Sequence, residues 1–300
     1  MITPPMHDGQ QGLDLATVTS LVAAHVPQLR GRPVRALAAS GTVNAIFRVG
    51  EWHTARFPLV PGEPASALAW LESEAAAALE LLGRTRFATP EPVVVVGPTV
   101  EHPHPWSVQT WLPGTDATQV DAADSQGLAV DLATLISEVR AIPTLGRVFE
   151  GAGRGGRLPD HDTWVQECLD RSAGLVDVAR LGALWADLRT RPRRGPDVMS
   201  HTDLIPGNLL VDGGRLVGVL DVGGFAPADP ALDLVCAWHV LDRRTRRVLR
   251  AELGCDDVEW DRGRAWALQQ ALGLVWYYER TNPVMARTGR RTLEQLLADA

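Results

Sequence analysis

The sequence predicts an α+β protein of two lobes, with a small five-stranded antiparallel sheet and one main helix before a larger, mostly helical lobe. Short β-branched and aromatic runs separated by glycine turns fill residues 34 to 111. Longer apolar runs of helical length fill most of residues 122 to 298. A Leu-Pro-Gly linker at 112–114 separates the two patterns, so the predicted domains are 1–111 and 112–300.

The first lobe is predicted to begin with a helix over residues 13–26. A second helix over 63–82 is rich in Ala and Leu, and Gly83 marks its end. The glycines at 41 and 50 mark turns between the first three strands. The five predicted strands are 34–39, 43–49, 52–57, 93–96 and 106–111.

The second lobe is predicted to be helical apart from one hairpin, with Gly-, Pro- and Arg-rich loops at 146–160 and 191–197. The hairpin has strands at 208–211 and 216–220, joined by an Asp-Gly-Gly turn at 212–214. The predicted helices are 122–141, 162–168, 176–190, 231–253, 259–280 and 284–298.

Composition excludes several functional classes. The formal net charge is −7, which disfavours a nucleic-acid binder and mildly favours a cationic small-molecule partner. The chain has no lysine, so it cannot carry the lysine of a P-loop nucleotide-binding site. No apolar run approaches membrane-spanning length and no signal peptide is visible, and three scattered cysteines suit a reducing compartment. We therefore expect a cytoplasmic protein without a membrane partner.

One basic cluster interrupts this acidic balance, at Arg243-Arg244-Thr245-Arg246-Arg247. Acidic and apolar residues flank the cluster on both sides. This pattern predicts an exposed face of the helix over 231–253 rather than a nucleic-acid contact.

Four polar residues around the predicted hairpin suggest chemistry. His201, Asp203 and Asn208 have the H-x-D-x(4)-N spacing of a phosphoryl-transfer loop, and Asp221 ends the second strand of the hairpin. A carboxylate such as Asp203 can accept a proton from an attacking hydroxyl. Amide and carboxylate oxygens such as those of Asn208 and Asp221 are ligands that Mg²⁺ prefers. The alternative is a plain hairpin with solvated acids.

The stretch Ser200–Leu210 resembles the H-G-D-x-x-P-G-N-x-L signature of the aminoglycoside phosphotransferase family, relatives of choline kinase with a protein-kinase-like fold. Residues 229–234, Asp-Pro-Ala-Leu-Asp-Leu, resemble the D-P-x-x-D-L segment of that family. Residues 104–108 and 111–114 are similar to its hinge strand. The resemblance covers about residues 35 to 298.

The resemblance implies a role for each residue of the motif. Asp203 would orient and deprotonate the acceptor hydroxyl, and Asn208 and Asp221 would hold Mg²⁺ against the phosphates of a nucleotide. His201 would brace the loop through hydrogen bonds. Asp229 would support the catalytic loop, and Asp233 would cap or brace the start of its own helix.

The nucleotide site is implied by matches in the first lobe. The turn Ser40-Gly41-Thr42-Val43-Asn44 occupies the place of the nucleotide-positioning loop, for which a plain hairpin turn is the alternative. Arg56 takes the place of the lysine that grips the phosphates. Its expected partner is Glu74, with Glu72 as the competitor. The base would lie against residues 109–111, which include Gln109 and Trp111.

Several positions depart from the family pattern without removing a catalytic group. Thr202 replaces the usual glycine and Ile205 a polar residue, while Val222 replaces an aromatic and Gly224 an acid found in many relatives. His239 is interpreted as a residue of the core or of a groove lining.

The resemblance implies an ATP- or GTP-dependent phosphotransferase that acts on a hydroxyl of a small molecule, with aminoglycoside-type antibiotics as candidate acceptors. A macrolide, a sugar or an amino-alcohol are alternative acceptors. The second hypothesis is a non-catalytic nucleotide-binding pseudokinase, which the departures at 202, 222 and 224 would support. The oligomeric state is not predicted.

Overall fold

The computed structural model describes residues 12–37, 43–60 and 62–299. The chain divides into two compact units. The first contains residues 1–82, 88–113 and 221–223, and the second contains residues 83–87, 114–220 and 224–300. The short segment 221–223 therefore belongs to the first unit although the chain on both sides of it belongs to the second.

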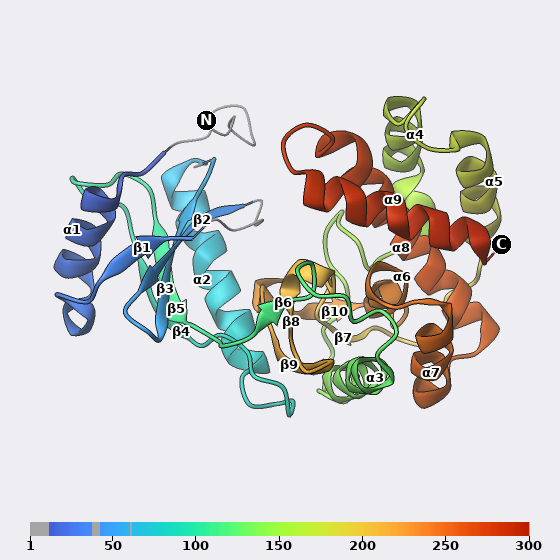
Figure 1. The fold of residues 1–300 in the computed structure, drawn as a ribbon, viewed down its shortest axis with the longest axis horizontal. Coiled ribbons are helices and arrows are strands. Elements are labelled where there is room, and N and C mark those ends of the chain that lie inside the picture. Colours follow the sequence, from blue (N-terminus) through green and yellow to red (C-terminus); the bar gives the residue numbers. More distant parts are fainter. Residues whose placement is uncertain (1–11, 38–42, 61, 300) are drawn as a thin grey trace. The chain divides into compact units, whose positions relative to one another are not determined.

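The first unit is built on a five-stranded sheet in which every neighbouring pair is antiparallel, in the order β1-β2-β3-β5-β4 (Figure 1). This confirms the predicted α+β class with its five-stranded antiparallel sheet. The predicted strand at 34–39 is observed over its first three residues, and residues 38 and 39 lie outside the described part of the chain. The strands are β1 (Val34–Ala36), β2 (Asn44–Val49), β3 (His53–Pro58), β4 (Pro92–Val96) and β5 (Trp106–Thr110).

Two helices accompany the sheet, α1 (Leu15–His25) and α2 (Pro64–Leu81). The side chain of Asp14 accepts a hydrogen bond from the amide of Thr17, which caps the start of α1. Glu63 caps α2 in the same way, and Pro64 follows at a position where a helix needs no amide hydrogen. One apolar core joins the buried face of α1 to the sheet, where Phe57 stacks on Trp106 with ring centroids 4.8 Å apart.

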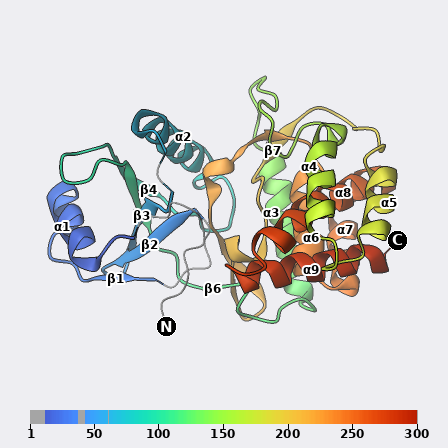
Figure 2. The ribbon, with the colours of Figure 1, turned by 90° about the horizontal axis from the view of Figure 1, so that it is seen from above.

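The second unit is mostly helical, with α8 at its centre. Helices α4, α5, α6 and α9 all pack against α8 (Figure 2). Helix α8 buries most of its residues between Arg262 and Val275, so it is packed against neighbours on nearly its whole circumference. The helices are α3 (Gln126–Arg140), α4 (Asp162–Arg171), α5 (Val178–Leu188), α6 (Val235–Val240), α7 (Arg243–Leu253), α8 (Asp257–Tyr277) and α9 (Pro283–Ala298).

The single helix predicted over 231–253 is wrong, because the chain breaks twice in this region. A 3₁₀ turn over Leu232–Leu234 leads into α6, and α6 ends before Asp242. The Asp242 side chain accepts from the amides of Arg244 and Thr245, so it starts α7 as a separate helix.

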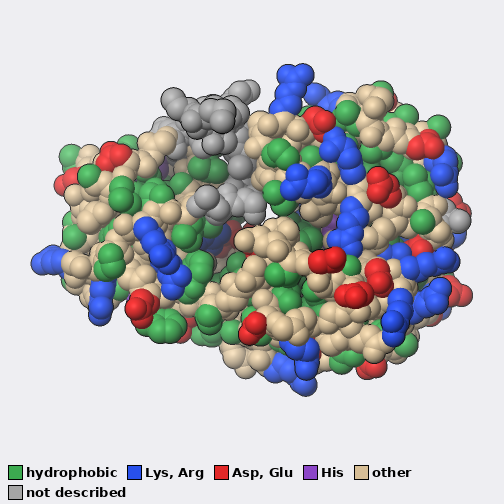
Figure 3. Space-filling view, viewed as in Figure 1, with side chains coloured by type: hydrophobic (Ala, Val, Ile, Leu, Met, Phe, Trp, Pro, Cys, Tyr) green, Lys and Arg blue, Asp and Glu red, His purple; other side chains and the backbone are tan. Residues whose placement is uncertain are grey.

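The arginine-rich cluster is only partly an exposed helix face. Arg243 and Arg247 are exposed, but Arg246 is buried and its guanidinium forms an ion pair of 2.9 Å with Asp299. In the space-filling view, arginine and acidic side chains lie next to one another over the helical unit (Figure 3).

The predicted hairpin is present as β8 (Leu209–Asp212) and β9 (Arg215–Val219), with Gly213 and Gly214 at positive φ in its turn. The sequence did not predict three short strands of the second unit. Strand β6 (Thr115–Asp116) pairs with β8, and β7 (Val198–Ser200) pairs with β10 (Ala226–Ala228). Across the part of the chain that is described, no helix is both long enough and apolar enough to cross a membrane.

Candidate active site

The loop that follows β7 carries the predicted catalytic residues, and His201 fixes its shape. The imidazole of His201 is buried, with Nε2 2.9 Å from the carbonyl oxygen of Leu220 and Nδ1 accepting from the amide of Asp203 at 3.3 Å. His201 thus joins the start of the loop to the end of β9. This confirms that it braces the loop.

Asp233 also supports this loop. Its carboxylate is buried and accepts from the amides of His201 and Thr202, both at 2.9 Å. The roles expected for the two acids of the 229–234 segment were therefore wrong. Asp233 supports the catalytic loop, whereas Asp229 binds the amide of Ala231, the guanidinium of Arg262 and the indole of Trp266. Asp233 lies within the 3₁₀ turn, whereas the residue at the N-cap position of α6 is Leu234.

Asp203 is held by three donors from three different segments. Arg154 Nη2 donates to Oδ1 at 2.7 Å, and Gln270 Nε2 donates to the same oxygen at 2.6 Å. Asn208 Nδ2 donates to Oδ2 at 3.0 Å and to the main-chain oxygen of Asp203 at 2.9 Å. The carboxylate is about three-tenths exposed, so it remains accessible to a reactant.

Asn208 uses one end of its amide for this contact. Because its NH₂ group donates to Asp203, its amide oxygen is the end left for another partner. The backbone of Asn208 is fixed by the amide of Leu220, which donates to its carbonyl at 2.8 Å. Asp221 follows Leu220 directly in the chain, and its backbone is in the left-handed region, with φ 55°.

Within the first unit, Asp221 forms a cluster with Arg56. Arg56 Nη2 lies 3.3 Å from Asp221 Oδ1, and Arg56 Nη1 donates to Gln109 Oε1 at 3.3 Å. Arg56 and Gln109, two of the predicted nucleotide residues, are therefore in contact.

The expected ion pair of Arg56 with Glu74 is not formed among the described residues; Asp221 takes the place of Glu74. Partial burial raises the pKa of Glu74 to about 7, against the opposing effect of the Arg56 charge and with a smaller contribution from the carboxylate of Asp221. A Cβ on Gly223 would lie 2.7 Å from the Glu74 side chain, so the two segments are tightly packed here.

The remaining predicted nucleotide residues are only partly described. Ser40 and Thr42 lie outside the described residues. Asn44 begins β2 and is buried, and its side-chain oxygen has no hydrogen-bond partner within the described part of the chain. The ring of Trp111 lies under the guanidinium of Arg48, 4.3 Å from the ring centroid.

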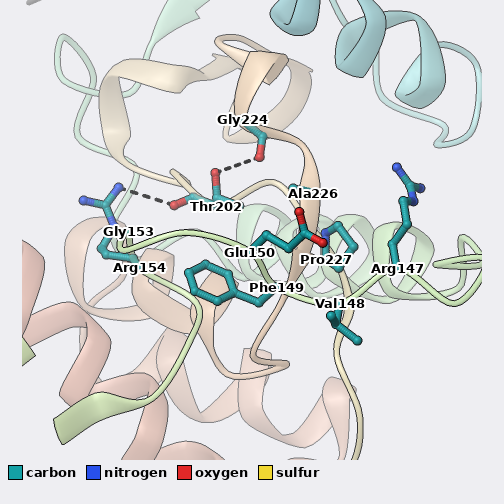
Figure 4. A pocket seen from close by; sticks show the side chains of 10 residues that line it. All are labelled: Arg147, Val148, Phe149, Glu150, Gly153, Arg154, Thr202, Gly224, Ala226 and Pro227. Carbon is teal, nitrogen blue, oxygen red and sulfur yellow. Dashed lines mark hydrogen bonds between the residues drawn. The ribbon is translucent and has the colours of Figure 1, made fainter. Parts of the chain in front are cut away.

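A pocket of about 570 Å³ adjoins the catalytic loop within the second unit (Figure 4). Phe149, Ala226 and Pro227 supply apolar surface, and Arg154 and Thr202 belong both to the pocket wall and to the surroundings of Asp203. Figure 4 shows Arg154 directed at the carbonyl of Thr202, while the Thr202 hydroxyl points to the carbonyl of Gly224.

Two departures from the family signature, Thr202 and Gly224, turn out to be coupled. Thr202 has φ 74°, a conformation that a β-branched residue rarely adopts and that the usual glycine would take freely. A Cβ on Gly224 would lie 2.6 Å from the Thr202 hydroxyl oxygen. Thr202 therefore leaves no room for a larger residue at 224.

Two residues that contact Asp203 were missed by the sequence reasoning. Arg154 was part of a loop without assigned function, and Gln270 lay inside a predicted helix. His239 was interpreted as core or groove lining, and it is buried in the core. No local spacing signal marks Arg154 or Gln270, because they lie 49 and 67 residues from Asp203 along the chain.

Comparison with known proteins supports the resemblance stated for the signature. The model of the phosphotransferase enzyme family matches residues 34–266. Aminoglycoside 3'-phosphotransferases from Salmonella typhimurium and Escherichia coli are 32% identical over 162 residues and 29% identical over 156 residues. Each match covers 48% of this chain and spans 57% of the relative's length.

Solved structures are similar over nearly the whole chain. The GDP complex of an aminoglycoside 2'-phosphotransferase has a TM-score of 0.70 at 20% identity, covering 96% of this chain and 99% of that one. A macrolide 2'-phosphotransferase from Brachybacterium faecium has a TM-score of 0.61 at 19% identity, covering 93% and 97%. At these identities the similarity shows the kinase-like fold alone. The family match, which covers most of the chain, shows more: this protein belongs to the phosphotransferase enzyme family.

Proposed function

We propose that this protein transfers the γ-phosphoryl group of ATP or GTP to a hydroxyl of a small molecule. Asp203 accepts the proton of the acceptor hydroxyl, and residues 112–300 carry the acceptor site. Residues 1–111 bind the nucleotide through Arg56, Gln109 and their neighbours. The full set of proposed nucleotide contacts is Ser40, Thr42, Asn44, Arg56, Glu74, Gln109 and Trp111.

The observation that carries this proposal is the environment of the Asp203 carboxylate, namely its hydrogen-bond donors and its exposure. Its carboxylate is held by a cation, Arg154, and by two amides, yet it is still partly exposed. An accessible carboxylate oxygen is the kind of group that accepts a proton in general base catalysis. Phosphoryl transfer depends mainly on positioning and electrostatics, so a fixed carboxylate beside an open surface suits the reaction.

We also propose that Asn208 and Asp221 hold a magnesium ion. The amide oxygen of Asn208 and the carboxylate of Asp221 are hard oxygen ligands, and a site with few protein ligands is usual for Mg²⁺ bound with nucleotide phosphates. The NH₂ of Asn208 is already engaged with Asp203, which leaves the oxygen end for a metal. When bound, Mg²⁺ would neutralise charge on the phosphates.

Solved relatives support both nucleotide donors and more than one acceptor class. They include complexes with GDP, ADP and ATP, and complexes with kanamycin, gentamicin and streptomycin. Macrolide phosphotransferases have the same fold. We therefore propose an aminoglycoside-type or macrolide-type alcohol as the acceptor class.

The decisive experiment offers the purified protein a panel of aminoglycosides, macrolides, sugars and amino-alcohols, each with ATP and with GTP in the presence of Mg²⁺. We expect at least one acceptor to gain the mass of one phosphoryl group. A protein that binds nucleotide but neither phosphorylates an acceptor nor hydrolyses the nucleotide would instead be the non-catalytic pseudokinase. Loss of nucleotide turnover in Asp221→Ala would support the enzyme.

Asp203→Ala is the first variant to measure. Removal of a general base typically costs about 100- to 10,000-fold in rate, so we expect kcat to fall at least about 100-fold. The control is Asp212→Ala, since Asp212 is an exposed acid at the turn of the nearby hairpin. Circular dichroism of both variants should match that of the unchanged protein. Undiminished turnover in Asp203→Ala would contradict the proposal.

A further inference from the structure

We propose that Arg154 and Gln270 are positioning residues that occupy Oδ1 of Asp203 and so reserve Oδ2 for the proton of the acceptor. This inference rests on the proposed function. It assigns separate tasks to the two oxygens of one carboxylate, and it gives a role to two residues that lie far from the signature motif.

The hydrogen bonds of Asp203 are unevenly divided between its oxygens. Each carboxylate oxygen can accept about two hydrogen bonds. Oδ1 accepts from Arg154 at 2.7 Å and from Gln270 at 2.6 Å, so its capacity is filled. Oδ2 accepts only from Asn208 among the described residues, at 3.0 Å. An incoming hydroxyl can therefore donate to Oδ2 without displacing a partner.

The first positioning group, Arg154, projects from a loop whose backbone is fixed at several points. Gly155, the next residue, accepts from the amide of Asp229 at 2.7 Å. A Cβ at Gly155 would lie 2.8 Å from Ala228, and a Cβ at Gly156 would lie 2.7 Å from the ring of Phe149. Both glycines allow a close approach that a larger residue would prevent. The loop thus holds the guanidinium of Arg154 at Asp203 from a rigid base.

The second positioning group, Gln270, is oriented by a buried chain of hydrogen bonds across three helices. Gln270 lies on α8, and its Oε1 is 3.2 Å from Nε2 of His239 on α6. Nδ1 of His239 is 2.9 Å from the hydroxyl of Thr292 on α9. All three side chains are buried.

The direction of this chain follows from the amide that faces Asp203. A carboxylate accepts, so the NH₂ of Gln270 must point at Asp203 and its oxygen at His239. His239 then carries its proton on Nε2, which leaves Nδ1 as an acceptor that faces the Thr292 hydroxyl. With His239 in this tautomer, the amide of Gln270 cannot turn round without losing a hydrogen bond at both ends.

The chemical step that this arrangement serves is balanced. The acceptor oxygen forms a bond to the γ-phosphorus, and the bond from that phosphorus to the β–γ bridging oxygen breaks. The bridging oxygen keeps the electron pair, which leaves a nucleoside diphosphate. The hydroxyl proton passes to Oδ2 of Asp203. Arg154 and Gln270 act through Asp203, because they keep Oδ2 turned towards the hydroxyl as the bond forms.

Adjacent glutamines on α8 provide a matched test of Gln270. Gln270→Met keeps the volume of the side chain but removes the donor to Asp203. Gln269→Met is the control, since Gln269 is equally buried and contacts His161 rather than Asp203. With the acceptor found in the panel, we expect kcat of Gln270→Met to fall about 10- to 100-fold with the KM for nucleotide unchanged. Gln269→Met should keep kcat within about twofold, even if it lowers the melting temperature as much as Gln270→Met does.

Arg154 is tested by a graded pair of substitutions. Arg154→Gln should lower kcat about 10- to 100-fold, and Arg154→Lys should recover part of the loss because an ammonium group can still donate to Oδ1. Arg157→Gln is the control, as Arg157 is an exposed residue on the same loop. A merely structural role of Arg154 would change the melting temperature without this split between kcat and KM.

The outcomes separate the inference from the proposed function. If the unchanged protein transfers phosphate and needs Asp203, but Gln270→Met and Arg154→Gln retain full kcat, the inference is wrong and the function stands. If the unchanged protein transfers no phosphate, or Asp203→Ala remains fully active, both are wrong. Loss of kcat in the two variants, with both controls active, supports the inference.

Discussion

At the scale of single residues, the loop after β7 is strained at Thr202, and the residues around Thr202 accommodate this strain. Thr202 has φ 74°, which typically costs about 1–3 kcal/mol in a residue that is not glycine. Two amide hydrogen bonds to Asp233 hold the backbone of His201 and Thr202 in place. The Thr202 hydroxyl then fills the space beside Gly224, so the residues at 202 and 224 form one packing unit.

This packing predicts a non-additive pair of substitutions. Gly224→Ala should lower the free energy of unfolding by about 1–3 kcal/mol, because its Cβ would overlap the Thr202 hydroxyl oxygen. In a Thr202→Gly background the same change should cost at least about 1 kcal/mol less. Urea unfolding of the four proteins of the cycle measures this coupling. Thr202→Ser is the control, since it keeps the hydroxyl and should keep the full cost of Gly224→Ala.

How much of the site the sequence revealed depends on the distance between residues along the chain. His201, Asp203 and Asn208 were found because one short loop contains all three, with Asp221 thirteen residues further on. Arg154 and Gln270 reach Asp203 only after the second unit has folded, and the sequence around them resembles an ordinary loop and an ordinary helix. Spacing can therefore single out the carboxylate proposed to react, but not the side chains that contact it.

At the scale of elements, the hairpin that precedes Asp221 is anchored to α3. Asp131 of α3 is buried and accepts from Nε and Nη2 of Arg215, both at 2.7 Å, and from the amide of Leu216 at 3.0 Å. The hydroxyl of Ser125, which caps α3, donates to the carbonyl of Gly214 at 2.6 Å. These bonds fix the turn end of the hairpin, and the opposite end leads into the loop residues Asn208 and Leu220.

We expect Asp131→Ala to destabilise the second unit by about 2–3 kcal/mol. The variant loses charge-assisted hydrogen bonds and leaves the buried amide of Leu216 without its acceptor. Arg215→Gln should cost less than about 1 kcal/mol, because the Arg215 side chain is largely exposed and the Leu216 bond survives. Thermal unfolding of the two variants compares these costs. Equal destabilisation by both would show that the exposed ion pair, not the buried amide, carries the effect.

The elements that the sequence mispredicted share a physical cause. Apolar residues run almost continuously from 231 to 241, which is typical of a buried helix, yet the break is set by the Asp242 side chain capping the next helix. Strands β6, β7 and β10 have two or three residues each, too few to produce an alternating pattern. The long helices and the five-stranded sheet were predictable because each repeats its pattern over many residues.

At the scale of the whole molecule, the pairing of acids with arginines matters more for the choice of acceptor than the net charge does. The acidic balance of −7 led to the expectation of a mildly favoured cationic partner. In the structure, several acids of the second unit are already paired with arginines, including Asp256 with Arg194 and Glu259 with Arg140. An arginine, Arg154, also lies against the proposed catalytic carboxylate. Net charge is therefore weak support for a polycationic acceptor, and the acceptor panel has to include uncharged alcohols.

The stability of the molecule should also depend on His239. Complete burial lowers the pKa of His239 to about 4, whereas an unfolded histidine titrates near its usual 6.5. Between these values the unfolded chain holds a proton that the folded chain lacks, so stability rises with pH across this range. Acidification from pH 6.5 to 4 should therefore remove at most about 3 kcal/mol of unfolding free energy through this group.

His239→Gln should reduce the loss of unfolding free energy between pH 6.5 and pH 4, because glutamine does not titrate. Urea unfolding at pH 7, 6, 5 and 4 measures the slope in both proteins, and the variant is expected to lose less stability on acidification even though it is less stable at pH 7. Identical slopes would show that His239 is protonated in the folded chain or that other groups dominate the pH dependence of stability. Since His239 also orients Gln270, the support of Asp203 should weaken only near pH 4, where the folded chain takes up the proton and the slope levels off.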